Sequence, residues 1–321
     1  MKKTLPGSCV IKAPCKINLH LRIGKKRPDG FHELESLFAS LALADLLHFK
    51  TVREGDGDRL LINWKISRRE CPPEPLLPEK NLVLRAVSLF RERTGFEMPL
   101  QIRLEKRIPL GAGLGGGSSD AASSLLALNF LSGAELSMEE LQGMAILLGS
   151  DVPFFLTGGA AFVSGRGELV RPVENLKKLW VVLAKPPYSS GTANAFRLLD
   201  LAREKIQSNY KENAQFREYL AEEELILALG QETESWPFYN DFLPIFLDPE
   251  TFENAHSFRQ ILETFTGNGA SFANLSGSGS CCFGIFKAKK TAEKAKNALL
   301  KQGNYARLTF FLANKAKPVV K

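Results

Sequence analysis

The residues from Pro109 to Ala122, PLGAGLGGGSSDAA, carry the strongest chemical signal in this sequence, and five of them are glycine. Glycine lets a backbone adopt left-handed conformations and wrap closely around an anion, because it has no side chain. The run leads into a predicted helix of small and apolar residues, Ala121–Leu131, whose first N–H groups and positive dipole end attract anions. A flexible linker is the alternative, but linkers rarely run from a proline-fixed turn straight into an apolar helix. The pattern therefore predicts a phosphate-binding loop.

A phosphate site needs positive charge, and the glycine loop contains none. The P-loop motif would supply a lysine at the end of the loop, but no Gly-Lys-Ser or Gly-Lys-Thr occurs there. The spacing at 111–116 matches the dinucleotide fingerprint, which requires a strand after the helix. Here a second helix follows instead, beginning at Ser137. Lys16, Lys106 and Arg107 are therefore the candidate phosphate cations.

Length and composition indicate a globular protein with one large or two medium domains, since the chain has 321 residues, of which 44% are hydrophobic and 24% charged. No apolar stretch reaches the ~18–20 residues that span a bilayer, and no signal-peptide pattern opens the chain. We therefore expect a cytoplasmic protein without a membrane partner.

The chain carries 42 Lys and Arg against 35 Asp and Glu, a formal net charge of +7. Such an excess suits an anionic small molecule or nucleic acid. The basic residues are scattered and no nucleic-acid-binding module is visible, so we expect a small-molecule substrate and no nucleic acid. The sequence carries no signal for the oligomeric state. Five cysteines without C-x-x-C or zinc spacing fit a reducing compartment; they are Cys9, Cys15, Cys71, Cys281 and Cys282.

The segment Lys16–Ile23 alternates strictly between apolar and polar residues. This period is typical of a half-buried β-strand, and we expect it to pair with the preceding segment 10–12. Its apolar face holds Ile17, Leu19, Leu21 and Ile23, and its polar face holds Lys16, Asn18, His20 and Arg22. A turn at 28–30 leads into a second strand-like stretch, 31–49.

The remaining elements mix helices and strands without regular βα alternation, which indicates the α+β class. One helix is expected from Asn81 to near Gly95, and a capping box at 137–140 begins another that ends at Gly149. The other predicted elements are strands at 100–104, 180–184 and 306–312, a hairpin of 272–275 with 282–286, and a helix at 291–301. We expect two domains, 1–180 and 181–321.

Three blocks in sequence order resemble the GHMP kinases, small-molecule kinases unrelated to the P-loop fold. The block 109–122 resembles their phosphate loop, 148–154 their catalytic-aspartate block, and 13–21 with 27–33 their N-terminus. The segment 277–279 resembles their late glycine loop. The long glycine run is similar to that of the branch that phosphorylates 4-diphosphocytidyl-2-C-methyl-D-erythritol, whereas homoserine and mevalonate kinases more often have a shorter loop.

The resemblance implies a two-domain GHMP-kinase fold, with an N-terminal domain related to ribosomal protein S5 domain 2, a C-terminal ferredoxin-like domain and the active site in the cleft between them. It implies transfer of the γ-phosphoryl group of ATP, with Mg²⁺, to the 2-hydroxyl of that substrate in the non-mevalonate isoprenoid pathway. No counterpart of the magnesium-binding glutamate of other GHMP kinases is evident, so the metal ligands stay unassigned. The alternatives are another small alcohol, of the homoserine or mevalonate type, or nucleotide binding without catalysis.

Two residues match the catalytic positions of the family. Asp151 matches the base that accepts the hydroxyl proton, and Lys16 matches the lysine that keeps this carboxylate ionised and neutralises the moving phosphoryl group. From spacing alone, Asp151 is a helix N-cap and Lys16 is a lysine on a solvated strand face. The presence of both argues against a non-catalytic relative.

The resemblance assigns the ATP side to the glycine loop and to two residues before it. The matched positions are Pro109, Leu110, Gly111, Ala112, Gly113, Leu114, Gly115, Gly116, Gly117, Ser118, Ser119, Asn81 and Lys106. Asn81 is also a helix N-cap by its position, and the two serines are also residues that cap helices.

The substrate side is assigned to residues from several segments. The matched positions are Asn18, Phe31, His32, Asp151, Thr192 and Phe196. His32 resembles the residue that hydrogen-bonds the cytosine, and Phe31 and Phe196 resemble the aromatic residues that sandwich its ring. Core packing is the alternative for either phenylalanine. Stacking tolerates any base, so hydrogen bonds such as that of His32 must carry the specificity. Asn240 and Asp241 resemble further substrate-side positions.

Overall fold

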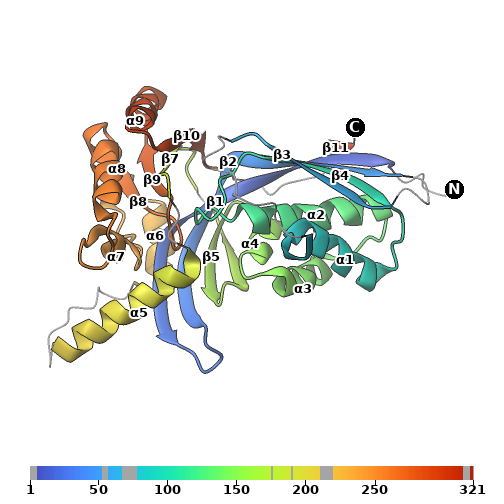
Figure 1. Ribbon diagram of the computed structural model, residues 1–321, viewed down its shortest axis with the longest axis horizontal. Coiled ribbons are helices and arrows are strands. Elements are labelled where there is room, and N and C mark those ends of the chain that lie inside the picture. Colours follow the sequence, from blue (N-terminus) through green and yellow to red (C-terminus); the bar gives the residue numbers. More distant parts are fainter. Residues whose placement is uncertain are drawn as a thin grey trace.

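The computed structural model describes residues 6–52, 57–66, 78–174, 176–188, 191–209, 220–313 and 319–320. Two β-sheets lie next to each other, and helices pack on each of them (Figure 1). Cys71 lies outside the described residues. Among the residues that are described, no helix is both long and apolar enough to cross a membrane.

The first sheet has seven strands in the described part of the chain. Five of them lie in the order β11-β1-β2-β4-β3; of the other two, β5 pairs with β2 and β6 pairs with β5. The strands are β1 (Ser8–Lys26), β2 (His32–Thr51), β3 (Arg59–Trp64), β4 (Leu100–Lys106), β5 (Ala160–Gly165), β6 (Leu169–Val173) and β11 (Val319–Val320). One face of this sheet is covered by helices (Figure 1). These are η2 (Pro78–Lys80), α1 (Leu82–Thr94), α2 (Gly116–Ser132), α3 (Met138–Leu148) and α4 (Val152–Thr157).

The second sheet has four strands in the order β10-β7-β9-β8. They are β7 (Trp180–Lys185), β8 (Phe272–Leu275), β9 (Cys282–Phe286) and β10 (Tyr305–Phe310), with α8 (Ala255–Gly267) and α9 (Lys289–Lys301) packed on them. Counted along the chain, this order is fourth, first, third, second, and the elements run β-α-β-β-α-β, which is the ferredoxin-like arrangement. Between β7 and α8 the chain also forms α5 (Thr192–Asn209), α6 (Glu222–Leu229), η3 (Thr233–Ser235) and α7 (Leu243–Leu247).

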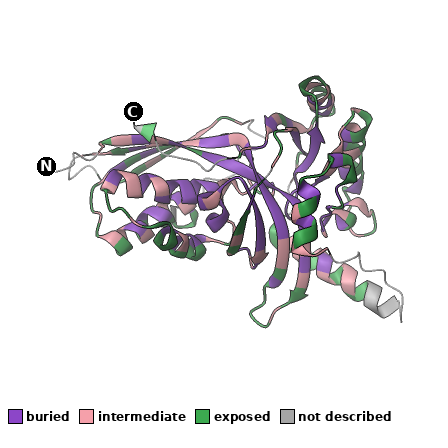
Figure 2. Ribbon diagram, turned by 180° about the vertical axis from the view of Figure 1, so that it is seen from behind, coloured by how far each residue is buried: buried purple, intermediate pink, exposed green. Residues whose placement is uncertain are grey.

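The long hairpin of β1 and β2 holds the two sheets together. Buried residues run along both strands and through the junction between the sheets (Figure 2). Ile11 of β1 belongs to the core under α1 and α2, Ile17 to the core that includes β7, and Ile23 to the core that includes α8. One strand therefore contributes to three hydrophobic cores, which fixes the position of the glycine loop relative to the second sheet.

The sequence prediction for the first strand was wrong in two respects. Segment 10–12 belongs to the same strand as Lys16, and the antiparallel partner is β2. The strand is also buried on both faces, since Lys16, Asn18 and His20 are only 3%, 2% and 1% exposed. Alternation shows which residues share a face, but it shows neither the partner strand nor what covers the polar face.

Irregular pairing in the hairpin occurs where the polar residues cluster. The register of β1 against β2 shifts between Pro14 and Lys16 and again between Asn18 and His20. A β-bulge bends a strand and redirects its side chains, and bulges are common beside active sites. Lys16 and Asn18 both border these shifts.

Helix α2 begins at Gly116, whereas the sequence predicted a start at Ala121. Glycine is a poor helix former, but a side chain at Gly116 would meet Ile108, whose Cγ2 lies 3.0 Å from the position of a Cβ. Tight packing therefore overrides propensity here. As a result, Ser118 and Ser119 lie in the first helical turn.

The local signals at the other helix ends were confirmed. Asn81 caps α1 and Gly95 ends it in a left-handed conformation, and Ser137 forms the expected capping box with Glu140. The hairpin of β8 and β9 also forms as predicted. The proposed division of the chain after residue 180 stays a prediction, and β11 returns the end of the chain to the first sheet.

Candidate active site

A cavity of about 340 Å³ lies between the glycine loop, the first sheet and the second sheet. It brings together most of the residues that the sequence assigned to phosphate, catalysis and substrate. They are Lys16, Asn18, residues 109–118, Asp151, Thr192 and Phe196, joined by Gly277 and Ser278 of the late glycine loop. Ser119, Asn81, Lys106, Phe31 and His32 do not line it.

Hydrogen bonds hold the glycine loop to β1 on one side and to the late glycine loop on the other. The Lys16 N–H donates a hydrogen bond to the Leu114 carbonyl (3.0 Å), and the Ser276 hydroxyl donates to the Gly113 carbonyl (2.9 Å). A Cβ on Gly113 would lie 2.1 Å from the Ser276 carbonyl oxygen. Gly113 also has φ +74°, a conformation that favours glycine. Only glycine therefore fits where the two loops meet.

The start of α2 forms one wall of the cavity. Its N-cap is Gly115, with φ 67°, which offers no side chain to the first turn, and that turn contains no acidic residue. The first N–H groups of a helix have no partner within the helix, and the helix dipole makes this end positive. The wall is therefore suited to a phosphate group.

Lys16 and Asp151 both line the cavity, and their charged groups form an ion pair. The Lys16 Nζ lies 3.5 Å from the Asp151 Oδ2 and donates a 2.7 Å hydrogen bond to the Asn18 Oδ1. The ammonium also lies 4.3 Å from the centre of the Phe38 ring. Burial lowers the pKa of Lys16, and the nearby Asp151 charge opposes this shift. Asn18 is itself fixed by a 2.9 Å hydrogen bond to Ser36.

Asp151 occupies the N-cap position of α4, as its spacing suggested, but its side chain makes no capping hydrogen bond. The carboxylate is instead directed at Lys16 and is one-third exposed. Among the described residues that line the cavity, Asp151 is the only carboxylate and Lys16 the only cation. Asp151 is therefore placed to act on a bound ligand.

Lys106 is not available as a phosphate cation, although the sequence made it a candidate. Its buried Nζ contacts Asp45 and lies 2.7 Å from the Asp120 Oδ2. Asp45 also accepts the N–H of Ile108 at 2.9 Å, which anchors the start of the glycine loop. Arg107, the third candidate, pairs with the side chain of Glu105. Lys16 alone of the three lines the cavity.

Burial raises the pKa of Asp120 to about 8; the charge of Lys106 lowers it and that of Asp45 raises it again. The Oδ1 of Asp120 is buried without a hydrogen-bond partner. Burial also works against the charge of Lys106, but the two carboxylates outweigh it and raise its pKa. Two carboxylates therefore share the single Lys106 ammonium, and burial favours the protonated form of Asp120.

A smaller hollow of about 140 Å³ adjoins the cavity through residues common to both, Leu82, Leu110 and Gly117. Asn81 and Lys106, the two ATP-side positions outside the loop, line this hollow. Asn81 also accepts the Val83 N–H at 2.9 Å, so its capping alternative holds as well. Trp64 lines the hollow too; nothing in the local pattern of its strand marked it as a site residue.

Helix α5 lines part of the cavity through Thr192 and Phe196. Phe196 stacks on the His32 ring, with centroids 5.0 Å apart and an interplanar angle of 25°. Phe31 is 52% exposed beside the Arg166 guanidinium. The sandwich of a ring between Phe31 and Phe196 stays a prediction, and His32 occupies one face of Phe196. The Thr192 hydroxyl accepts a 3.1 Å hydrogen bond from Ser278.

Asn240 and Asp241 do not line the cavity. The Asn240 amide donates to the carbonyls of Leu275 and Gly277, and so shapes the late glycine loop. Asp241 accepts the Ile23 N–H at 2.7 Å. Both residues hold the walls of the cavity in place and do not reach into it.

Two family models match the chain. The model "GHMP kinases N terminal domain" matches residues 81–159, and "GHMP kinases C terminal" matches 217–304. The chain is 36% identical over 277 residues to 4-diphosphocytidyl-2-C-methyl-D-erythritol kinase of Protochlamydia amoebophila (strain UWE25), covering 85% of this chain and 83% of that protein. The chain belongs to the GHMP kinase family.

Two further similarities concern the same branch of this family. The GHMP kinase is 44% identical over 191 residues to the chloroplastic 4-diphosphocytidyl-2-C-methyl-D-erythritol kinase of Oryza sativa subsp. japonica, 59% of this chain but only 46% of that relative's length. A crystal structure of 4-(cytidine 5'-diphospho)-2C-methyl-D-erythritol kinase matches with a TM-score of 0.73 and 33% identity, over 94% of this chain and 98% of that one. The predicted resemblance and fold class are confirmed.

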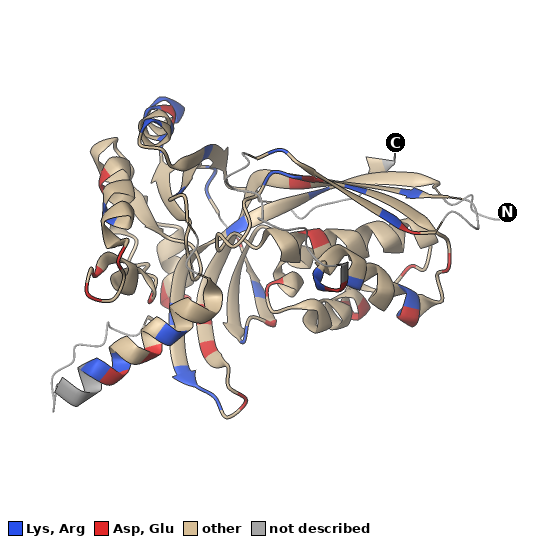
Figure 3. Ribbon diagram, viewed as in Figure 1, with Lys and Arg blue, Asp and Glu red and all other residues tan. Residues whose placement is uncertain are grey.

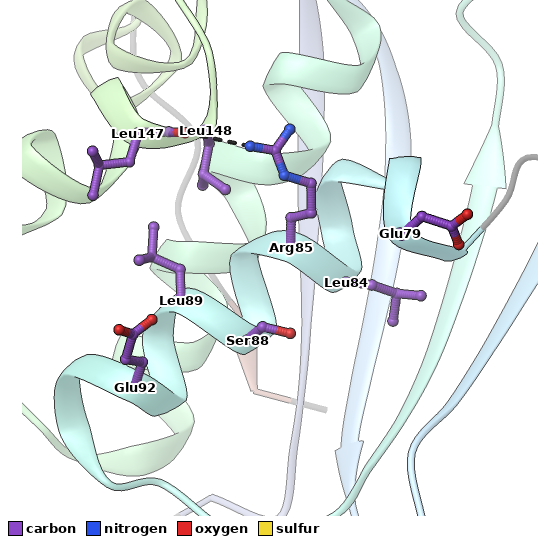
Figure 4. A pocket seen from close by; sticks show the side chains of 8 residues that line it. All are labelled: Glu79, Leu84, Arg85, Ser88, Leu89, Glu92, Leu147 and Leu148. Carbon is purple, nitrogen blue, oxygen red and sulfur yellow. Dashed lines mark hydrogen bonds between the residues drawn. The ribbon is translucent and has the colours of Figure 1, made fainter.

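A larger hollow of about 560 Å³ lies elsewhere on the GHMP kinase, between α1 and the end of α3. Figure 4 shows Arg85 reaching toward the Leu147 carbonyl across it, with Leu84, Leu89 and Glu92 along the same helix. None of the residues that the sequence assigned to the site lines this hollow. It is therefore not the candidate active site.

Replacing Gly113 by alanine should destabilise the GHMP kinase more than the same change at Gly95. Both glycines have similar φ angles, +74° and +70°, but a Cβ at Gly95 meets nothing within 4 Å. We expect Gly95→Ala to cost about 1 kcal/mol from backbone strain alone, and Gly113→Ala at least about 2 kcal/mol more. Urea unfolding of both variants measures this. Equal losses would show that the two loops do not meet as described.

Replacing Asp120 by asparagine should flatten the pH dependence of stability. The folded-state pKa of about 8 lies above the usual carboxyl value of ~3.9, so between these values the folded state holds a proton that the unfolded state has lost. The contribution of Asp120 to the free energy of unfolding is then greatest below pH ~4 and declines as the pH rises to about 8. We expect Asp120→Asn to gain stability relative to the wild type over this range, measured by urea unfolding at pH 5, 6.5 and 8. A constant difference would contradict the raised pKa.

Proposed function

We propose that this GHMP kinase transfers the γ-phosphoryl group of ATP to the 2-hydroxyl of 4-diphosphocytidyl-2-C-methyl-D-erythritol, a step of the non-mevalonate isoprenoid precursor pathway. The observation that carries the proposal is the buried Lys16 facing Asp151 at 3.5 Å in a cavity walled by the glycine loop. Relatives with this named activity, aligned over most of the chain, support the choice of substrate.

The triphosphate fits the start of α2. Backbone N–H groups of the glycine loop and of the first helical turn bind phosphate oxygens without the flexibility of long side chains. The adenine then extends into the adjoining hollow beside Asn81 and Trp64. Lys16 is the one positive side chain among the described residues that line the cavity, and it lies where the transferred phosphoryl group carries its charge.

Asp151 accepts the proton of the acceptor hydroxyl. As this oxygen forms its bond to the γ-phosphorus, the bond between phosphorus and the bridging oxygen breaks and ADP leaves with that electron pair. Lys16 favours the ionised carboxylate because the opposite charge lies within 4 Å. Most of the catalysis consists of holding the two substrates in line in a cavity that carries compensating charge.

Mg²⁺ would accompany ATP in this proposal and would supply positive charge for its phosphates. Mg²⁺ prefers oxygen ligands and commonly keeps several waters and substrate phosphates around it. The Ser118 hydroxyl is an oxygen donor at the cavity that would suit it. Within the described ranges, no three His, Cys, Asp or Glu side chains gather into a metal cluster.

The substrate is a small molecule, and we propose that the enzyme works in the cytoplasm without a nucleic-acid or membrane partner. Four cysteines in the described part of the chain are buried thiols, which suits a reducing compartment. Lys and Arg are spread over several strands and helices, with Asp and Glu between them, and do not form one stripe (Figure 3).

The test of this function is ADP formation by the purified protein with three acceptors in turn. We expect turnover with 4-diphosphocytidyl-2-C-methyl-D-erythritol and none above background with homoserine or mevalonate. Turnover with either of the other alcohols alone would assign a different acceptor. Binding of ATP without ADP release under all three conditions would instead identify a nucleotide-binding protein.

Asp151→Asn should remove catalysis while leaving ATP binding intact. The amide keeps the size of the side chain but cannot accept the hydroxyl proton, so we expect kcat to fall by about 10²–10⁴-fold. The affinity for ATP, measured by calorimetry, should stay within about threefold. No capping hydrogen bond is lost, but the buried Lys16 loses its ionic partner, so the melting temperature should fall. Wild-type turnover in this variant would rule out Asp151 as the base.

A further inference from the structure

Helix α5 contacts the β1–β2 hairpin through one face. Thr192, Phe196, Asp200 and Arg203 are spaced so that they lie on the same side of the helix. Arg203 donates hydrogen bonds to the carbonyls of Ile23 (2.7 Å) and Gly24 (3.2 Å) and so anchors the helix to the hairpin backbone. One turn closer to the cavity, Asp200 contacts a side chain of the hairpin instead.

That side chain is His32. Its Nε2 lies 3.0 Å from the Asp200 Oδ1, and its ring is stacked on Phe196, which lines the cavity. The ring is buried, with 7% of the side chain exposed. Among the described residues, the other ring nitrogen, Nδ1, has no hydrogen-bond partner. The exposed Lys26 also lies beside Asp200, with its Nζ 4.0 Å from the Asp200 Oδ2.

The hydrogen bond to Asp200 sets which ring nitrogen carries the proton. A carboxylate only accepts hydrogen bonds, so the Nε2 must donate. In a neutral imidazole one nitrogen is a donor and the other an acceptor, and the partner of the first determines the role of the second. When the His32 ring is neutral, its Nδ1 is therefore a hydrogen-bond acceptor.

We propose that Asp200 is a specificity-determining positioning residue that makes the kinase select cytosine over uracil. The inference rests on the proposed function and on the role that the resemblance gives His32, a hydrogen bond to the cytosine of the substrate. Cytosine presents an amine donor at position 4 and uracil a carbonyl acceptor, whereas their rings have nearly the same shape. An acceptor at His32 pairs with the amine and opposes the carbonyl. Stacking on Phe196 does not distinguish the two rings.

Kinetics with paired acceptors test this role. The probes are 4-diphosphocytidyl-2-C-methyl-D-erythritol and its uridine analogue, both at pH 8, above the usual titration range of imidazole. We expect the wild type to favour the cytosine acceptor by about 100-fold or more in kcat/KM. Asp200→Ala should reduce this ratio at least about tenfold, mainly through the KM of the cytosine acceptor.

Arg203→Ala is the matched control. It removes a second contact between the same helix and the same hairpin, but it does not touch His32. We expect it to lower kcat/KM for both acceptors by the same factor and to leave their ratio unchanged. If Asp200→Ala lowers kcat/KM by the same factor for both acceptors, Asp200 only anchors the helix. That result would overturn the proposal.

A measurement on the wild type keeps the proposal testable if Asp200→Ala fails to fold. The chain has four histidines, so the ¹⁵N signals of His32 can be assigned by comparison with His32→Asn. At pH 8 we expect the Nε2–H tautomer, and the Nδ1–H tautomer would overturn the proposal. If the wild type does not phosphorylate the cytosine acceptor at all, the proposed function fails and this inference with it. Turnover without base selectivity overturns the inference alone.

Discussion

The active-site cavity depends on the contact between two glycine-rich segments. Gly113 approaches the Ser276 carbonyl so closely that no side chain fits between them, and hydrogen bonds from Ser276 and Lys16 hold the loop from both sides. This contact joins the first sheet to the second. The start of α2 is also uncovered, because the residue before the helix is Gly115, which has no capping side chain.

Two lysines near the glycine loop have different electrostatic roles. Lys106 is enclosed by Asp45 and Asp120, so its charge is used to fix the loop to β2 and α2. Lys16 is equally buried, and within the described part of the chain its ionic partner is the partly exposed Asp151 alone. Burying a charge is costly unless it is paired. A phosphoryl group bound beside Lys16 would supply the additional negative charge that this site lacks.

Features that depend on neighbouring residues could be predicted from the sequence. The glycine run, the caps at Asn81 and Ser137 and the hairpin of β8 and β9 each have a local signal, and the structure contains them. The position of Asp151 at the start of a helix also followed from its spacing. The resemblance to the GHMP kinases added the roles of these residues, which spacing alone assigned differently.

Features that depend on contacts between distant residues could not be predicted. Asp45 lies 61 residues before Lys106, and no periodic pattern links them. Asp200 contacts His32 across 168 residues, and no local pattern links them. The burial of both faces of β1 arises because a second sheet packs beside it, and the alternation of a single strand contains no information about that neighbour.

The most direct test of the central claim is a crystal structure of the enzyme with a nonhydrolysable ATP analogue and the diphosphocytidyl acceptor. The claim predicts that the phosphates accept hydrogen bonds from backbone N–H groups of residues 111–119, and that the acceptor 2-hydroxyl lies within hydrogen-bond distance of Asp151. Phosphates bound elsewhere, with Asp151 directed away from the acceptor, would contradict it.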